Sequence, residues 1–512
     1  MDDSVQSKNK RIAKNTLMLY FRMFLIMAVS LYTSRVILQV LGIVDYGIYN
    51  VVGGIVMMFS FISSAMTFTT QRYLNFAMGE NDEDQLNKVF NTSILIHLII
   101  ALIILLFAET IGLWFLYNKI VVPEDRFNAA FWCYQFSILT TCFVVLSFPY
   151  NAAIIAHEKM SAFAYISIVD VVAKLIVVYL LLVSSIDRLI LYGILLMLIQ
   201  VAITELYRVY CRKKFSESKL SVKMIDKKLF KGMLSFSGWN LFGNIAHICL
   251  TQCTNIMLNI FFGPAVNAAN AISVHVQKAV CQFVTSFQTA QNPQIVKSYA
   301  SKDLDYMHNL MFRATRFSLY LCLIPSIPII FETESILKLW LGEYPEYTEI
   351  FVQLAMATSL VQSLAMPIFT GCMATGEIKR MMVYVSLIFW SIVPLSYIAL
   401  KIGGDPQIVF VLVLLLHTIA HLTRVKIVGA QLGFSFLNYS KQVFVPIGIV
   451  TCLSFVFGCG INTIMHAEGL LLLFAKITIE LALSLCVVTF IGLTKSERKA
   501  IVNFVKEKIH KR

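Results

Sequence analysis

Long apolar segments, each ended by a short polar turn, follow one another along almost the whole chain. Most are long enough, at about 20 residues, for an α-helix to cross the hydrocarbon core of a bilayer. The pattern predicts an all-α polytopic membrane protein with about fourteen transmembrane helices. These helices are expected near residues 12–38, 46–75, 88–116, 127–154, 161–183, 188–209, 232–262, 266–292, 308–331, 347–373, 381–400, 407–428, 442–464 and 469–493.

The composition leaves no room for a soluble catalytic domain. Hydrophobic residues make up 58% of the 512 residues and charged residues 14%, against about a quarter charged in globular proteins. The longest polar stretch, from Arg208 to Lys231, is a basic linker. We therefore expect an N-terminal six-helix lobe over 1–209, a cytoplasmic linker over 210–231, a C-terminal six-helix lobe over 232–430, and two extra helices with a basic tail over 431–512.

Basic residues are unevenly divided between the two predicted membrane faces. With this helix count, 32 of the 42 Lys and Arg residues fall on the face that holds both termini. The opposite face receives five, which are Lys119, Arg126, Arg188, Lys338 and Lys401. The positive-inside rule places both termini in the cytoplasm. The net charge of +13 then faces anionic membrane lipids, and no basic and aromatic surface indicates nucleic-acid binding.

A weak internal repeat has an offset of about 221 residues. Gly42, after the first predicted span, aligns with Gly263, after the seventh. Farther along, Asn81–Asp84 aligns with Lys302–Asp305, and each segment opens the next helix. Six spans in each unit give both halves the same orientation, so we expect parallel repeats related by an axis along the membrane normal. The last two helices fall outside the repeat.

Polar residues recur every three or four positions along the seventh and eighth predicted spans. The seventh carries Asn240, Asn244, His247, Thr251, Asn255 and Asn259. The eighth carries Asn267, Asn270, Gln277, Lys278, Gln282, Thr285, Gln288, Thr289 and Asn292. Such stripes are either hydrogen-bonding contacts between helices or the wall of a water-filled cavity. Because they run the full length of two consecutive helices, we favour a cavity.

Three basic residues, Arg22, Lys174 and Lys278, lie deep within predicted spans. Each must face protein or water, because a cation at the bilayer centre costs about 2.5–3.5 kcal/mol. Asp170, one turn before Lys174, is either its structural ion-pair partner or a coupling residue. Lys476 lies near a span end beside Glu480, and we expect it to reach the interface. We expect no lone buried carboxylate of the kind that couples transport to protons or sodium ions.

A positively charged cavity lined by amides and hydroxyls suits an anionic, sugar-bearing substrate. The residues that we expect to bind such a substrate are Arg22, Lys174, Lys278, Asn244, His247, Thr251, Asn255, Gln277 and Gln282.

No pattern indicates an enzyme, a metal or a cofactor. Asp82-x-Asp84 and Asp303-x-Asp305 have the spacing of a metal-binding motif in glycosyltransferases, but both stand where helix N-caps are expected. Asp82 and Gln85 have the spacing of a capping box. The eleven cysteines form no metal-binding pattern, and no P-loop is present.

The N-terminal region resembles a known family in several motifs. Residues 11–16 read RIAKNT, residues 34–38 read SRVIL, residues 41–49 read LGIVDYGIY and residues 71–73 read QRY. Together these resemble the Wzx-type polysaccharide flippases of the multidrug/oligosaccharidyl-lipid/polysaccharide (MOP) exporter superfamily, and the layout extends the resemblance over nearly the whole chain.

The resemblance implies a MATE-like fold and transport of an undecaprenyl-pyrophosphate-linked oligosaccharide across the bacterial cytoplasmic membrane. Such transport serves O-antigen, lipopolysaccharide or capsule synthesis, with polysaccharide polymerase machinery as a candidate partner. Two alternatives stay open. A related multidrug or cation antiporter would use Asp170 as its exchanging acid, and a membrane-embedded glycan-processing enzyme would need Asp82, Asp84, Asp303 and Asp305.

Overall fold

The computed structural model describes residues 2–59, 61–118, 122–184, 186–221, 224–465 and 469–499. Within these ranges every regular element is helical. Twelve of the described helical stretches are long and apolar enough to cross a membrane. The prediction of an all-helical, multi-pass membrane protein is therefore confirmed, whereas the count of fourteen spans stays a prediction.

Two predicted spans are not among these twelve. The first is the span predicted over residues 46–75. Its residues are divided between the part of helix α1 (Asp2–Phe59) that follows the break at Gly42 and helix α2 (Phe61–Glu80). Helix α9 (Pro264–Ala300) covers the predicted eighth span. It has ample length, but its many amide side chains lower its hydropathy. Polarity rather than length separates α9 from the apolar helices.

The chain divides into two compact units, Arg11–Leu241 and Phe242–Arg512, the latter together with Met1–Lys10. The division falls inside helix α8 (Lys227–Phe262). The predicted boundaries at 209, 231 and 430 stay predictions.

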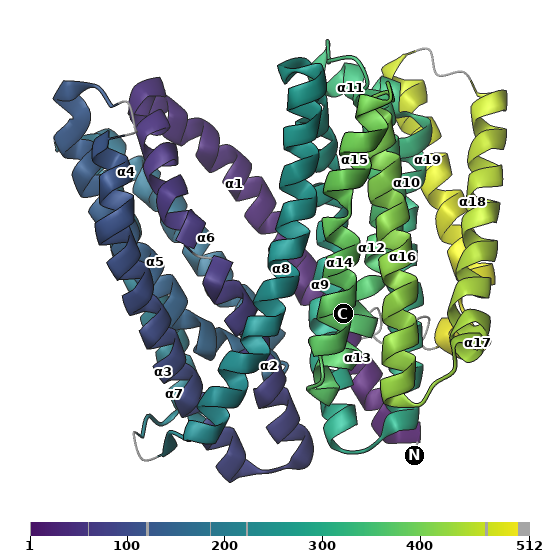
Figure 1. Ribbon diagram of the computed structural model, residues 1–512, viewed down its shortest axis with the longest axis horizontal. Helices are drawn as coiled ribbons and strands as arrows, with labels where there is room; N and C mark the ends of the chain where they lie inside the picture. Colours follow the sequence, from purple (N-terminus) through teal and green to yellow (C-terminus); the bar gives the residue numbers. More distant parts are fainter. Residues whose placement is uncertain are drawn as a thin grey trace, which may run out of the picture. The chain divides into compact units, whose positions relative to one another are not determined.

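The first unit is built around helix α5 (Phe127–Ala156). This helix packs against α2, α3 (Glu83–Phe107), α6 (Met160–Val183) and α7 (Arg188–Lys214), whose ribbons can be followed in Figure 1. Shorter elements complete this unit: η1 (Ala108–Gly112), α4 (Leu113–Asn118), η2 (Glu124–Arg126) and η3 (Ser216–Ser218).

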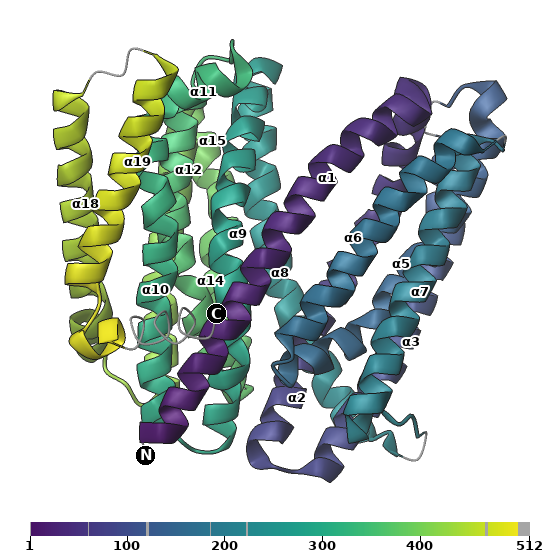
Figure 2. The same cartoon turned by 180° about the vertical axis from the view of Figure 1, so that it is seen from behind.

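The second unit has α9 packed against α10 (Leu304–Phe331), α12 (Thr348–Ser363) and α13 (Ala365–Thr375). Its other helices are α11 (Thr333–Leu341), α14 (Lys379–Trp390), α15 (Ile392–Lys401), α16 (Gln407–Leu432), α17 (Phe436–Tyr439), η5 (Ser440–Phe444), α18 (Val445–Ile464), α19 (Leu470–Val487) and η6 (Val488–Gly492). Helices α18 and α19 pack on each other and on α10 at one edge of this unit (Figure 2).

The internal repeat has a clear counterpart in the backbone. Gly42 has φ 77° and ψ 171°, and Gly263 has φ 79° and ψ −171°. This combination is open almost only to glycine, because a Cβ would clash with the backbone. Farther along, Asn81 and Lys302 share the left-handed conformation, with φ of 57° and 59°. In both pairs, two residues 221 positions apart in the sequence therefore have the same unusual backbone geometry. The axis that relates the repeats stays a prediction.

The aspartates after these left-handed residues cap helices. The Asp82 carboxylate accepts a hydrogen bond from the Gln85 amide at 2.9 Å, and the Asp303 carboxylate accepts one from the Tyr306 amide at 3.2 Å. Each bond satisfies an amide that has no carbonyl partner in the first turn of its helix. The capping interpretation of these aspartates is confirmed.

The LGIVDYGIY segment of residues 41–49 is tied to the starts of two other helices. Arg126, just before α5, donates to Asp45 Oδ1 at 2.8 Å and to Asp187 Oδ2 at 2.5 Å. Asp187 also caps α7 through the amides of Leu189 and Ile190. Burial tends to raise the pKa of Asp187, but the bonds from Arg126 and from these amides together lower it. In this motif Asp45 serves to fix three helix ends to one another.

Candidate functional site

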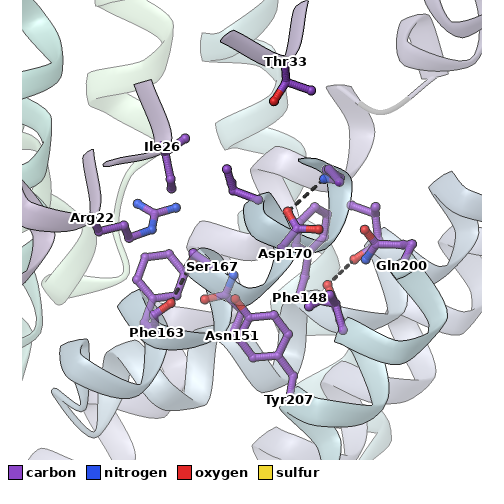
Figure 3. A pocket seen from close by; sticks show the side chains of 15 residues that line it. Arg22, Ile26, Thr33, Phe148, Asn151, Phe163, Ser167, Asp170, Gln200 and Tyr207 are labelled. Atoms are coloured by element: carbon purple, nitrogen blue, oxygen red, sulfur yellow. Dashed lines mark hydrogen bonds and ion pairs between the residues drawn. The ribbon is translucent and has the colours of Figure 1, made fainter. Parts of the chain in front are cut away.

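A cavity of about 500 Å³ with a mixed polar and apolar lining lies within the first unit, among helices α1, α5, α6 and α7 (Figure 3). Its volume falls in the range of small-molecule sites. Nine of its lining residues are polar, and they are Arg22, Thr33, Ser147, Asn151, Ser167, Asp170, Lys174, Gln200 and Tyr207.

Helical spacing brings these side chains together. On α6, Phe163, Ser167, Asp170 and Lys174 follow one another at intervals of four, three and four residues, so they share one face. On α5, Ser147 and Asn151 are four residues apart. The other faces of both helices stay largely apolar, as expected for helices that cross a membrane.

Two of the cavity's three charges compensate each other. Lys174 Nζ donates to Asp170 Oδ2 at 2.8 Å, one helical turn away. The second oxygen, Asp170 Oδ1, is buried without a hydrogen-bond partner. The expected ion pair is therefore present, so Lys174 is not an unpaired cation of the cavity.

Arg22 forms no ion pair among the described residues, although the Asp170 carboxylate of the same cavity lies near enough to act on its charge. Its guanidinium carbon lies 4.3 Å from the centre of the Phe163 ring, and Figure 3 shows its side chain reaching into the space between Phe163 and Asp170. Its Nε is buried and without a hydrogen-bond partner. A cation–π contact stabilises the guanidinium charge but leaves its N–H groups free to donate hydrogen bonds in the plane of the guanidinium. The cavity thus carries two positive charges and one negative charge.

Neutral polar groups complete the wall, and the sequence interpretation missed them. Asn151 Oδ1 is buried and unpartnered, whereas Gln200 Nε2 lies 3.4 Å from Thr204 Oγ1. Ser167 donates to the Phe163 carbonyl at 2.8 Å. The available signal was that each residue lies three or four positions from another lining residue of its own helix. Single polar residues in apolar helices, however, do not stand out as a stripe.

The other predicted binding residues lie in the second unit. Asn244, His247, Thr251 and Asn255 are on α8, and Gln277, Lys278 and Gln282 are on α9. The cavity in the first unit brings together Arg22, Lys174 and Asp170 but none of these seven. Lys278 is exposed and makes no ion pair or hydrogen bond with any described residue.

The polar stripe of α9 divides into two adjacent faces. Gln277 donates to the Ala355 carbonyl of α12 at 3.4 Å, and Gln288 donates to the Ser363 carbonyl at 2.9 Å. Asn270, on the same face, bonds to Asn255 of α8. Lys278 and Gln282 are exposed and lie about 80° to 140° round the helix from these three residues. One face thus holds helices together, while the other presents free polar groups.

Two expectations about buried charges are wrong. Lys476 does not reach an interface but is buried and paired with Glu332. Near it, Glu480 is a buried carboxylate of the kind that the sequence was not expected to contain. Glu332 comes from a segment far away in the chain, so no local spacing reveals this cluster. Among the described residues, no group of three or more His, Cys, Asp or Glu side chains could hold a metal ion.

Comparisons with known proteins identify the fold. No protein-family model and no curated protein matches the chain. Several solved structures do match over most of their length. A mutant MATE protein has a TM-score of 0.70 at 11% identity, covering 82% of this chain and 96% of its own. A mutant of the Vibrio cholerae MATE transporter VcmN has a TM-score of 0.67 at 16% identity, covering 85% and 99%.

A third similar structure is a MOP superfamily transporter from Pyrococcus furiosus, described as having a binding pocket of reverse polarity that suggests a different function. Its TM-score is 0.67 at 12% identity, covering 82% of this chain and 96% of its own. Identities this low establish the fold alone. This chain has the all-helical fold of the MATE transporters of the MOP superfamily.

Proposed function

We propose that this protein is a transporter that moves an undecaprenyl-pyrophosphate-linked oligosaccharide from the inner to the outer leaflet of the bacterial cytoplasmic membrane. The observation that carries the proposal is the partly buried Arg22, which lines the cavity without an ion-pair partner, while Lys174 already pairs with Asp170. A guanidinium in such a place has a strong preference for an anion. A pyrophosphate provides both the charge and the oxygen acceptors.

In this mechanism the cavity replaces water around the polar head of the lipid. Arg22 donates to the pyrophosphate oxygens, while Asn151 and Gln200 offer amide groups to sugar hydroxyls. The polyprenyl chain stays in the bilayer. Lys278 and the free polar face of α9 would provide further contacts when the protein alternates between inward-open and outward-open states. No bond is made or broken, because the protein only lowers the barrier to crossing hydrocarbon.

The fold supports transport, and the description of one similar structure concerns the polarity of its binding pocket. The Pyrococcus furiosus transporter is described as having a pocket of reverse polarity. The net positive pocket of this chain is in keeping with an anionic substrate. We further propose that this transport serves the synthesis of O-antigen or capsule and that the polymerase machinery docks on the protein. The cytoplasmic location of both termini is part of the same proposal.

A multidrug or cation antiporter is the second candidate, and Asp170 favours it. Its Oδ1 is buried without a hydrogen-bond partner inside the cavity, so it could bind a proton or a cationic drug. The pair with Lys174 argues against this role, because the ammonium already neutralises the carboxylate.

Binding to purified protein tests the proposal and separates the two candidates. We expect undecaprenyl-pyrophosphate-linked N-acetylglucosamine to bind in detergent, with Arg22→Ala weakening it about 10- to 100-fold, since a charged hydrogen bond contributes about 1.5–3 kcal/mol. Undecaprenol, which lacks the pyrophosphate, should show no difference between the two proteins. Lys338→Ala, which removes an exposed charge outside the cavity, is the matched control.

The opposite results would favour the antiporter. If Arg22→Ala binds the pyrophosphate lipid as tightly as the wild type, the proposed site is wrong. If the wild type instead binds ethidium and Asp170→Asn abolishes that binding, the cavity serves cations.

A further inference from the structure

A buried ionic cluster lies in the second unit, where α19 packs against α10 and α18. Lys476 on α19 forms an ion pair with Glu332, the residue that follows α10. Lys476 Nζ also donates to Asn462 Oδ1 on α18 at 2.7 Å. The Lys476 and Glu332 side chains are only 3% and 4% exposed. One ammonium therefore connects three segments in a region closed to solvent.

Glu480 lies one turn farther along α19 and has no such partner. The residue is 1% exposed, and both of its carboxylate oxygens are buried without a hydrogen-bond partner among the described residues. It lies about 15 Å along the helix axis from Leu470, where α19 begins. That position is deep within a helix long enough to cross the membrane.

The charges in this cluster do not balance if Glu480 is ionised. Glu332 and Lys476 cancel each other, so a Glu480 carboxylate would add an unpaired negative charge in a dry environment. Burying such an ion without a partner is strongly unfavourable, whereas a protonated carboxyl adds no charge.

No other charged group offers compensation from the neighbouring helices. Helix α18 contains no Asp, Glu, Lys, Arg or His, and η6 contains none either. On α10, Arg316 pairs with Glu497, which lies beyond the C-terminal end of α19. Arg313 precedes Arg316 by less than one helical turn, so it also lies toward that end of α10. The thiols of α18 are exposed. Among the described residues, Lys476 is thus the single cation placed to respond to Glu480.

We propose that Glu480 is a reversible proton-binding site and that its proton couples transport to the proton gradient; the coupling rests on the proposed function. Lys476 and Glu480 are four residues apart on one helix, the spacing of an ion pair. When Glu480 loses its proton, the ammonium can turn from Glu332 to Glu480. The link between α10 and α19 then weakens. Proton binding would in this way switch the contact between the last two helices and the rest of their unit.

Infrared spectroscopy of the protein in nanodiscs tests proton binding without any substrate. We expect the wild type to show a protonated carboxyl band that disappears between about pH 5 and about pH 9, and Glu480→Gln to lack it. Glu332→Gln should move the loss of this band to lower pH, because Lys476 then has only Glu480 as a partner. A wild-type spectrum that does not change over this range, or an unchanged band in Glu480→Gln, would overturn the site.

Proteoliposomes test the coupling. A pH gradient should accelerate translocation of labelled undecaprenyl-pyrophosphate-linked N-acetylglucosamine by the wild type, and Glu480→Gln should lose this acceleration while keeping its binding of the lipid. Equal acceleration in both proteins would refute the coupling. If the wild type moves none of this lipid, the proposed function and the coupling that rests on it fail, whereas the infrared result still decides the proton site.

Discussion

At the scale of single residues, the partner of each charge within a helix bundle determines what that charge can do. Lys174 has Asp170 one turn away, and Lys476 has Glu332. Arg22 lies over the Phe163 ring and forms no ion pair among the described residues. The charge of a paired ion is compensated within the protein, whereas an unpaired ion retains a preference for an external partner. Arg22 is therefore the residue on which the functional proposal depends.

The Lys476–Glu332 pair gives a prediction about stability. Lys476→Met should lower the free energy of unfolding by about 3–5 kcal/mol, because it leaves Glu332 buried without its counterion. Adding Glu332→Gln should recover part of this loss. The measurement is thermal unfolding in detergent, followed by fluorescence-detected size-exclusion chromatography.

Lys338→Met is the matched control for this experiment. Lys338 also pairs with a glutamate, Glu334, but both side chains are more than half exposed. We expect no change in melting temperature, since exposed pairs contribute little. A loss as large as that of Lys476→Met would mean that burial does not decide the difference.

Sequence spacing revealed the local charge pairs but not the distant ones. Asp170 and Lys174 are four residues apart, so their ion pair followed from helical geometry alone. Lys476 and Glu332 meet only because α19 packs on α10, and a single sequence carries no sign of that contact. For the same reason the sequence did not show that Arg22 and Lys174 share a cavity while Lys278 lies in the other unit.

At the scale of helices, hydrophobic length predicted most elements because lipid demands it. A membrane helix must satisfy its own backbone and present apolar side chains, so its sequence pattern is strong. The prediction was weakest for α2 and α9, where polar residues replace part of that pattern. In α9 the amides of Gln277 and Gln288 bond to other helices, which explains how such a polar helix stays inside its unit.

The two turn glycines give a prediction at this scale. Gly42→Ala and Gly263→Ala should each destabilise the protein by about 1–3 kcal/mol, because both residues adopt a conformation that is almost exclusive to glycine. Thermal unfolding in detergent measures the effect.

Gly238→Ala provides the control, since Gly238 lies within α8 and an added Cβ meets no atom within 4 Å. Here we expect unchanged or slightly higher stability, because alanine favours helix. Equal losses at Gly42 and Gly238 would contradict the conformational explanation.

At the scale of the whole molecule, the two units each repeat one arrangement of turns and caps, and both belong to a MATE-like fold. The fold class could be predicted because hydropathy and the internal repeat are properties of the chain itself. The orientation in the membrane rests on the distribution of Lys and Arg.

Cysteine labelling tests that orientation. In a background without the eleven native cysteines, Lys338→Cys should react with a membrane-impermeant maleimide in intact cells. Lys228→Cys, in the first turn of α8 on the predicted cytoplasmic face, should react only after the membrane is opened. Reaction of Lys228→Cys in intact cells would show that the predicted topology is inverted.

The central claim is that the unpaired charge of Arg22 serves the passage of an anionic glycolipid head. The most direct test is translocation of a fluorescent undecaprenyl-pyrophosphate-linked oligosaccharide in proteoliposomes, scored by quenching from outside. We predict transfer by the wild type, loss of at least about tenfold in rate for Arg22→Ala, and partial recovery for Arg22→Lys, which restores the charge but not the planar donor geometry. Equal transfer by the wild type and Arg22→Ala would contradict the account.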